Sequence, residues 1–136
     1  KEVGLSAGEA DKSPLVYLKK LALVRKVPVF RELSNAQADG MVAAMDQVTV
    51  SAGKVVFAEG DAADKFYMIA SGYVQVLIGG KEVRKLGAGA CFGERALLLS
   101  EPRSATIKVA EADVGLWFIS RETFRSVVSD TMREKL

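Results

Sequence analysis

Apolar side chains recur at helical spacing along the first part of the chain. After Pro14, a favoured first residue of helices, Leu15, Leu18 and Leu21 repeat every three residues, while lysines occupy the other faces. This pattern predicts an amphipathic helix, which Pro28 ends. We expect the leucine stripe to face the core and the lysines to face solvent.

A second helix is predicted shortly after the first. Ser34 is followed three residues later by Gln37, which is the pattern of a capping box at a helix N-terminus. Behind it lies an apolar stripe at helical spacing, which consists of Ala38, Met41, Val42 and Met45. Residues 14–46 are therefore expected to form N-terminal helices.

The pattern changes to short β-rich runs after Asp46. These runs alternate with glycines, and the pair Gly79-Gly80 is typical of a two-residue hairpin turn. The predicted strands are residues 47–51, 54–58, 65–71, 73–78, 81–86, 104–110 and 114–120. Seven or eight short strands at this spacing favour a small β-barrel or jelly roll across residues 47–120.

Helical signals return at the end of the chain. Ser120 is a predicted N-cap for a helix that carries Phe124 and Val127, and Asp130 is expected to begin another helix. Residues 121–136 are thus expected to be C-terminal helices. Residues 1–13 offer few apolar side chains to bury and are expected to form a flexible tail. The remainder, residues 14–136, is expected to form a single domain.

The composition of the chain excludes several classes of function. With 49% hydrophobic and 26% charged residues, the 136-residue chain resembles an ordinary globular domain, and its net charge of +2 does not suggest a nucleic acid partner. It contains no histidine and one cysteine, which excludes an intrachain disulfide, a Cys/His zinc site and an imidazole base. Because no apolar run approaches the roughly twenty residues that span a bilayer, we expect no membrane contact and a cytoplasmic location.

Residues 87–106 interrupt the strand pattern and have the composition of an anion site. Glycines such as Gly89 and Gly93 let a backbone approach a ligand closely, and residues 94–98 are predicted to form one helical turn. Arg103 can hold a phosphate through two charge-assisted hydrogen bonds. Glu94 beside a phosphate favours a ligand that also offers hydroxyl groups, as a ribose does. A plain salt bridge between Glu94 and Arg103 is the structural alternative.

The same stretch carries a family resemblance. Residues 92–97, Phe-Gly-Glu-Arg-Ala-Leu, and residues 102–106, Pro-Arg-Ser-Ala-Thr, resemble the phosphate-binding cassette, residues 92–106 here, of cyclic nucleotide-binding domains. Residues 83–87 and Trp117-Phe118 are most similar to such domains in cGMP-dependent protein kinases of apicomplexan type. The resemblance implies a mainly β fold with flanking helices. It would be an eight-stranded jelly-roll β-barrel with N-terminal helices and a C-terminal lid helix region.

The resemblance also implies a role for individual residues. Glu94 would accept a hydrogen bond from the ribose 2′-hydroxyl, and Arg103 would pair with the cyclic phosphate. Ser104 and Arg84 occupy positions from which cGMP-selective domains contact guanine, although serine also occurs at the former in domains that prefer cAMP. The full set of implied binding residues is Gly93, Glu94, Arg95, Ala96, Arg103, Ser104, Ala105 and Arg84.

The implied function is regulatory and not catalytic. The ligand would be cGMP, or alternatively cAMP, with no catalytic residue, metal or cofactor. Occupancy would be passed through the flanking helices to a protein kinase catalytic domain in the same longer chain. The alternative is a cAMP-binding regulatory module of a kinase, channel or other effector. A cupin-type metalloenzyme, a transcription regulator of the catabolite-activator type and a barrel that has lost its ligand are less favoured.

Overall fold

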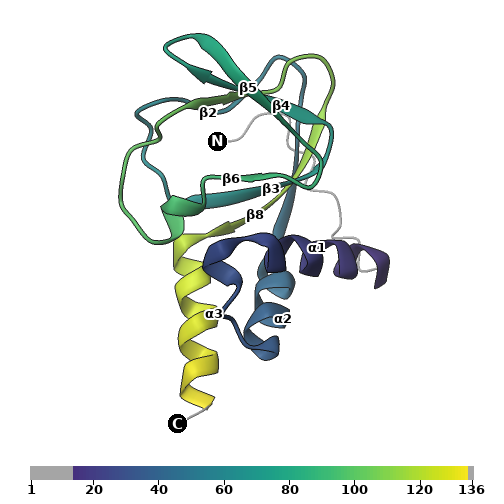
Figure 1. The fold of residues 1–136 in the computed structure, drawn as a ribbon, viewed down its shortest axis with the longest axis vertical. Coiled ribbons are helices and arrows are strands. Elements are labelled where there is room, and N and C mark those ends of the chain that lie inside the picture. Colours follow the sequence, from purple (N-terminus) through teal and green to yellow (C-terminus); the bar gives the residue numbers. More distant parts are fainter. Residues whose placement is uncertain (1–13, 135–136) are drawn as a thin grey trace.

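The computed structural model describes residues 14–134, which form eight strands and three α-helices (Figure 1). The strands are β1 (Asp46–Val50), β2 (Val55–Phe57), β3 (Lys65–Ser71), β4 (Tyr73–Ile78), β5 (Lys81–Gly87), β6 (Cys91–Phe92), β7 (Thr106–Lys108) and β8 (Val114–Ser120). The helices are α1 (Pro14–Lys26), α2 (Asn35–Ala44) and α3 (Arg121–Glu134), with short 3-10 helices η1 (Pro28–Phe30) and η2 (Glu94–Leu97).

The strands form two antiparallel sheets of four strands each. The first sheet has the order β1-β8-β3-β6 and the second has the order β2-β7-β4-β5. A core of buried side chains lies between them, including Val48, Ile69, Val74, Ile107 and Leu116. The jelly-roll prediction is confirmed, although the strands form two facing sheets and not a closed barrel.

The helices cover the outer face of the first sheet, below it in Figure 1. Side chains from that face, such as Phe66 and Trp117, join Phe30, Met41 and Phe124 from the helical segments in a second core. Both faces of β3 and β8 are therefore buried, which explains their nearly continuous apolar sequences. The predicted capping box begins α2, because the Ser34 and Gln37 side chains and backbone N–H groups bond reciprocally.

The predicted buried face of α1 is only partly correct, because Leu21 packs against the core but Leu15 and Leu18 do not. Leu15 and Leu18 are 61% and 58% exposed, whereas Leu23 is buried. Lys20 is buried as well, with its Nζ atom 5.5 Å from the centroid of the Trp117 ring. Because α1 carries apolar residues on more than one face, leucine spacing alone did not identify the face that packs against the sheet.

Two further predictions need correction. α3 is one helix through Glu134, so Asp130 does not begin a separate one. Neither glycine nor proline occurs in this segment, so its backbone continues without a break. Strand β6, which pairs with β3, was not predicted because its two residues lie in a glycine-rich stretch.

The predicted tail, residues 1–13, lies outside the described residues. Within residues 14–134, no helix combines the length and apolarity needed to cross a bilayer.

Candidate functional site

A cavity of about 570 Å³ lies beside the segment that joins β6 to β7. Its lining includes every binding residue implied by the sequence: Arg84, Gly93, Glu94, Arg95, Ala96, Arg103, Ser104 and Ala105. Apolar side chains from both sheets, among them Val76, Phe92 and Ile107, form the rest of its wall. The fold therefore brings together a set of residues that the sequence only placed in order along the chain.

Gly93 sets the direction of the chain at the cavity wall. Its backbone is left-handed, with φ of 83°, and η2 begins at the next residue. A Cβ atom at position 93 would lie 2.5 Å from Nη1 of Arg103 and 3.2 Å from the carbonyl oxygen of Lys65. Glycine is thus required both for the backbone angle and for the close approach of the guanidinium.

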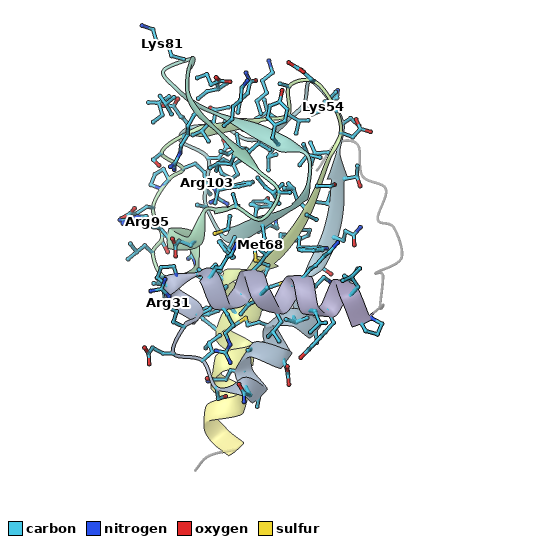
Figure 2. The ribbon with its side chains drawn as sticks, turned by 45° about the vertical axis from the view of Figure 1, so that its right-hand side comes forward. Arg31, Lys54, Met68, Lys81, Arg95 and Arg103 are labelled. Carbon is cyan, nitrogen blue, oxygen red and sulfur yellow. The ribbon has the colours of Figure 1, made fainter. Side chains whose placement is uncertain are left out.

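Arg103 lies in the β-sheet part of the molecule (Figure 2), where a backbone carbonyl and an aromatic ring hold its side chain. Its Nη2 atom donates a hydrogen bond to the carbonyl of Lys65 at 2.7 Å. The guanidinium carbon lies 3.9 Å from the centroid of the Phe57 ring, close enough for a cation–π interaction. Its Nε atom is buried and has no hydrogen-bond partner in the described part of the chain. A buried N–H donor without a partner costs free energy, so a ligand that supplied an acceptor to Nε would be stabilised.

The electrostatic state of Arg103 also favours an anion. Burial lowers the pKa of its guanidinium, an effect that interactions with Tyr67, Asp64 and Asp61 oppose. A partly desolvated cation is stabilised when an anion replaces the lost water. The backbone is fixed as well, because the Arg103 N–H donates to the backbone carbonyl of Asp61, and the Arg103 carbonyl accepts from the Gly60 N–H. This cation is therefore positioned before any anion binds.

Glu94 is half-buried and lines the same cavity. Its carboxylate forms no hydrogen bond or ion pair with another residue of the described chain, so the alternative of a salt bridge to Arg103 is not realised. Both carboxylate oxygens remain able to accept hydrogen bonds.

The nearby Cys91 is partly buried, and burial, with a smaller effect from Glu94, raises the pKa of its thiol. Cys91 is thus a protonated apolar wall residue at neutral pH.

Three backbone N–H groups in the lining of the cavity, those of Ala96, Ser104 and Ala105, differ in their availability to an anion. The N–H of Ala96 donates to the Gly93 carbonyl at 3.0 Å, so an anion would share or displace that bond. Among the described residues, neither Ser104 nor Ala105 donates its N–H to a protein acceptor. The latter two N–H groups, next to the Arg103 side chain, are the better anion donors.

Arg84 and Arg95 lie at the rim of the cavity. Arg84 is exposed on β5, as its possible contact with a nucleobase requires. Arg95 is also exposed and makes a two-pronged contact with Glu101, with its Nη2 atom 2.9 Å from Oε1. Hydrogen bonding to Glu101 raises the pKa of Arg95. Because its guanidinium is already paired with Glu101, Arg95 forms part of the rim and is less available to bind an anionic ligand.

The arrangement matches a known family. The family model of the cyclic nucleotide-binding domain matches residues 47–131, which include both sheets and the cavity wall. The chain belongs to the cyclic nucleotide-binding domain family. Residues 92–106, which the sequence analysis compared with the phosphate-binding cassette of this family, lie within the matched range, and we call them the cassette below.

Relatives of this cyclic nucleotide-binding domain include protein kinases and their regulatory subunits. The chain is 37% identical over 125 residues to a cGMP-dependent protein kinase of Eimeria tenella, covering 92% of this chain and 12% of that one. It is 38% identical over 112 residues to a cAMP-dependent protein kinase regulatory subunit of Blastocladiella emersonii, covering 79% and 28%, respectively.

Solved structures agree with this assignment. The regulatory domain of Toxoplasma gondii PKA with cAMP matches with a TM-score of 0.75 and 29% identity, covering 91% of this chain and 49% of that one. This chain therefore spans less than half of that structure, and only 12% of the Eimeria tenella kinase.

One residue that contacts the wall of the cavity was missed in the sequence analysis. Arg121, the first residue of α3, donates to the carbonyls of Ala96, Ala63 and Leu99 and to the hydroxyl of Ser100. It thereby ties the start of α3 to η2 and the cassette. Only its place directly after the last strand could have drawn attention to it, because its partners are distant in sequence.

Replacing Gly93 by alanine is expected to impair both folding and ligand binding. A left-handed backbone costs a residue with a Cβ atom about 1 to 2 kcal/mol, and chemical denaturation should show a loss of that size. Displacing the Arg103 guanidinium should also weaken cyclic nucleotide binding about fivefold, or roughly 1 kcal/mol, as measured by titration calorimetry.

Gly53→Ala is the matched control for this variant. Gly53 has the similar φ of 84°, but nothing lies within 4 Å of its would-be Cβ atom. We expect Gly53→Ala to lose similar stability and to retain its affinity. Equal affinity in the two variants would show that Gly93 matters for the backbone alone.

Proposed function

We propose that this domain binds cGMP in the cavity of about 570 Å³ and acts as a regulatory module. Arg103 pairs with the cyclic phosphate, and the N–H groups of Ser104 and Ala105 add donors. Glu94, in the lining of the same cavity, accepts from the ribose 2′-hydroxyl. The observation that carries the proposal is that one cavity is lined by Arg103, whose Nε donor has no partner among residues 14–134, and by Glu94, whose carboxylate also has none there.

The preference for guanine rests on two polar groups. Guanine offers O6 and N7 as acceptors, whereas adenine has an amino donor in place of O6. Arg84 and Ser104 are both exposed and line the cavity. Arg84 would donate to the guanine edge, and the Ser104 hydroxyl would accept from the guanine amino group. The similarity to the cGMP-dependent kinase of Eimeria tenella supports the same choice.

Binding of cAMP is the second candidate. It is favoured by the similarity to the Blastocladiella emersonii regulatory subunit and by the match to the Toxoplasma gondii domain solved with cAMP. The two candidates share the phosphate and ribose contacts and differ only at the base. Their separation therefore depends on the rim residues.

The proposed effector is a protein kinase catalytic domain in the same longer chain, in the cytoplasm. Arg121 joins the cassette to α3, and α3 contacts α2, so a change in the cassette reaches the helical layer directly. The ligand can drive such a change only if it binds one arrangement of the cassette more tightly than the other.

Calorimetric titration with cGMP and with cAMP tests the proposed function. We expect saturable binding of both, with cGMP tighter, and recovery of intact nucleotide by chromatography after incubation. Binding of neither nucleotide would contradict the proposal. Appearance of the linear 5′-monophosphate would contradict the assignment of a role without turnover.

Ser104→Ala is expected to narrow the preference for cGMP over cAMP. A partly exposed hydrogen bond is worth about 0.5 to 1.5 kcal/mol, so cGMP binding should weaken by about twofold to tenfold while cAMP binding stays nearly constant. Competition titrations measure both constants, and Ser126→Ala, at an exposed position on α3, serves as the control. Equal weakening of both nucleotides would instead assign the hydroxyl to the phosphate or the fold.

A further inference from the structure

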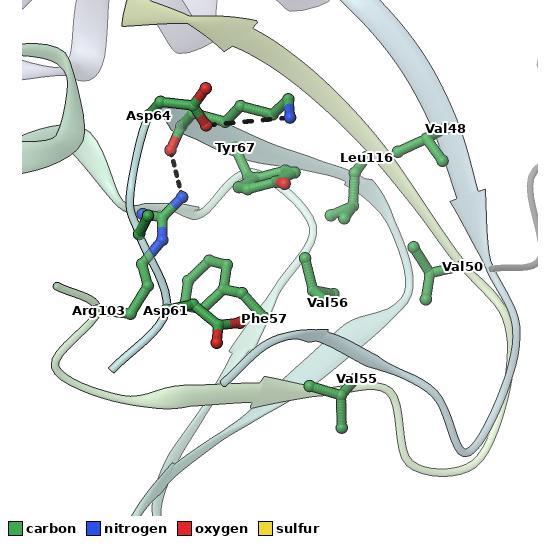
Figure 3. A pocket seen from close by; sticks show the side chains of 12 residues that line it. Val48, Val50, Val55, Val56, Phe57, Asp61, Asp64, Tyr67, Arg103 and Leu116 are labelled. Atoms are coloured by element: carbon green, nitrogen blue, oxygen red, sulfur yellow. Dashed lines mark hydrogen bonds and ion pairs between the residues drawn. The ribbon is translucent and has the colours of Figure 1, made fainter. Parts of the chain in front are cut away.

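A second cavity, of about 430 Å³, adjoins the nucleotide cavity between the two sheets (Figure 3). Its long walls are aliphatic and come from β1, β2 and β8: Val48, Val50, Val55, Val56 and Leu116. Phe57 and Tyr67 also line it. None of the five aliphatic residues lines the nucleotide cavity. The two cavities thus have different walls and a different chemistry.

The interior of this second cavity suits an apolar molecule. Val48, Val50 and Leu116 are 2%, 5% and 0% exposed, whereas Val55 is 43% exposed, so the aliphatic wall is shielded from water at β1 and β8 and open to it at Val55 on β2. Burying an apolar surface against such a wall is favourable, whereas a polar group there would lose its hydration without a partner.

The rim of the second cavity does not select a charged ligand. Two carboxylates, Asp61 and Asp64, and two cations, Lys65 and Arg103, line it. The carboxylates are exposed, and Asp64 lies 3.9 Å from the Lys65 ammonium. Because opposite charges balance and partly pair, neither an anionic nor a cationic head group gains a net attraction.

The size of the cavity also fits a small organic ligand. Apolar cavities of about 150 Å³ in proteins bind benzene, and ordinary ligand pockets run from about 300 to 1,000 Å³. The second cavity, at about 430 Å³, lies in the lower part of that range. It can therefore hold a molecule somewhat larger than one aromatic ring.

Two residues, Phe57 and Arg103, line both cavities. Their side chains are stacked, with the guanidinium carbon 3.9 Å from the Phe57 ring centroid, and Figure 3 shows the pair side by side. A molecule in the second cavity would pack against the same ring that supports the guanidinium. Occupancy of one cavity can therefore affect the other through a direct contact.

We propose that the second cavity is a binding site for a small, uncharged, apolar molecule, and that its occupant supports Arg103 in the position that receives the nucleotide phosphate. The site itself follows from the cavity and its walls. Its effect on nucleotide binding rests on the function proposed above for the neighbouring cavity.

Methyl NMR spectroscopy of the full chain, with toluene as the probe, tests the site directly. We expect saturable shifts of the methyl resonances of Val48, Val50 and Leu116. Benzoate has nearly the same ring but a charge, and it should bind at least about tenfold more weakly, because burying its carboxylate is costly. Absence of saturable shifts with toluene, or equal binding of benzoate, would overturn the proposal.

Variants that fill the second cavity make the test specific. Val56→Phe should weaken toluene binding by about tenfold or more, and Val56→Leu, a smaller change, should weaken it by about threefold. Val83→Phe adds the same ring at a 54%-exposed position on β5 outside both cavities and should leave binding unchanged. Unchanged binding in both Val56 variants would place toluene elsewhere and refute the site.

The coupling is measured by titrating cGMP with and without saturating toluene. We expect cGMP to bind at least about twofold more tightly with toluene, and toluene to gain the same factor with cGMP, as linkage requires. Identical cGMP affinities would refute the coupling through Arg103, while the methyl shifts decide the site independently. If cGMP does not bind at all, the proposed function fails and the toluene result still stands.

Discussion

Replacing Arg103 by alanine is expected to weaken cyclic nucleotide binding by about tenfold to a hundredfold. A hydrogen bond to a charged group contributes about 1.5 to 3 kcal/mol, and each 1.4 kcal/mol corresponds to about a factor of ten. Arg103 lines the cavity, and its buried Nε atom has no hydrogen-bond partner in the described chain. The phosphate is the group that would supply the missing acceptor.

Calorimetric titration of Arg103→Ala and Arg103→Lys with cGMP measures this effect. Lysine keeps the charge but not the planar fork, so its affinity should fall between those of alanine and the wild type. Glu94→Ala should matter less than Arg103→Ala, because a carboxylate makes only hydroxyl contacts here. Arg31→Ala changes an exposed arginine outside both cavities and should bind normally.

The competing explanation assigns Arg103 a structural role. The side chain donates to the Lys65 carbonyl and stacks on Phe57, so its removal also affects the fold. Thermal denaturation of Arg103→Ala separates the two effects. A folded Arg103→Ala domain with wild-type affinity would show that the stacking and the hydrogen bond are the whole role of the residue.

Much of the site could be predicted because its residues lie in one short segment. The glycines, Glu94 and Arg103 occur within residues 87–106, and their types alone indicate an anion with hydroxyl groups nearby. Arg84 comes from outside this segment and was placed only through the family resemblance. The fold class was predictable for a similar reason, since alternating apolar residues and glycine-marked turns define most strands locally.

The remaining features depend on contacts between distant segments. The buried face of α1 is chosen by packing against the sheet, where Lys20 covers Trp117, and no local spacing encodes that choice. The second cavity is formed by β1 and β2 together with β8, which begins more than fifty residues after β2 ends. The role of Arg121 arises in the same way, from carbonyl groups brought together only by the fold.

Arg121→Ala is expected to lower the free energy of unfolding by about 2 to 4 kcal/mol, because it breaks a hydrogen-bond network and leaves carbonyl groups without donors. The Arg121 Nε atom donates to the carbonyl of the buried residue Ala96 at 2.7 Å, and Nη1 donates to the Ser100 hydroxyl at 2.7 Å. Nη2 serves the carbonyls of Ala63 and Leu99. Guanidinium chloride denaturation measures the loss.

Arg125→Ala is the matched control for Arg121→Ala. Arg125 lies one turn further along α3 and is exposed, so its removal should change stability by no more than about 0.5 kcal/mol. Because Arg121 holds the carbonyls of the cassette, Arg121→Ala should also weaken cGMP binding, whereas Arg125→Ala should not. If Arg121→Ala loses stability but keeps its affinity for cGMP, the hydrogen bonds of Arg121 support the fold alone. The cassette and α3 would then be mechanically independent, and regulation through α3 would need another contact between them.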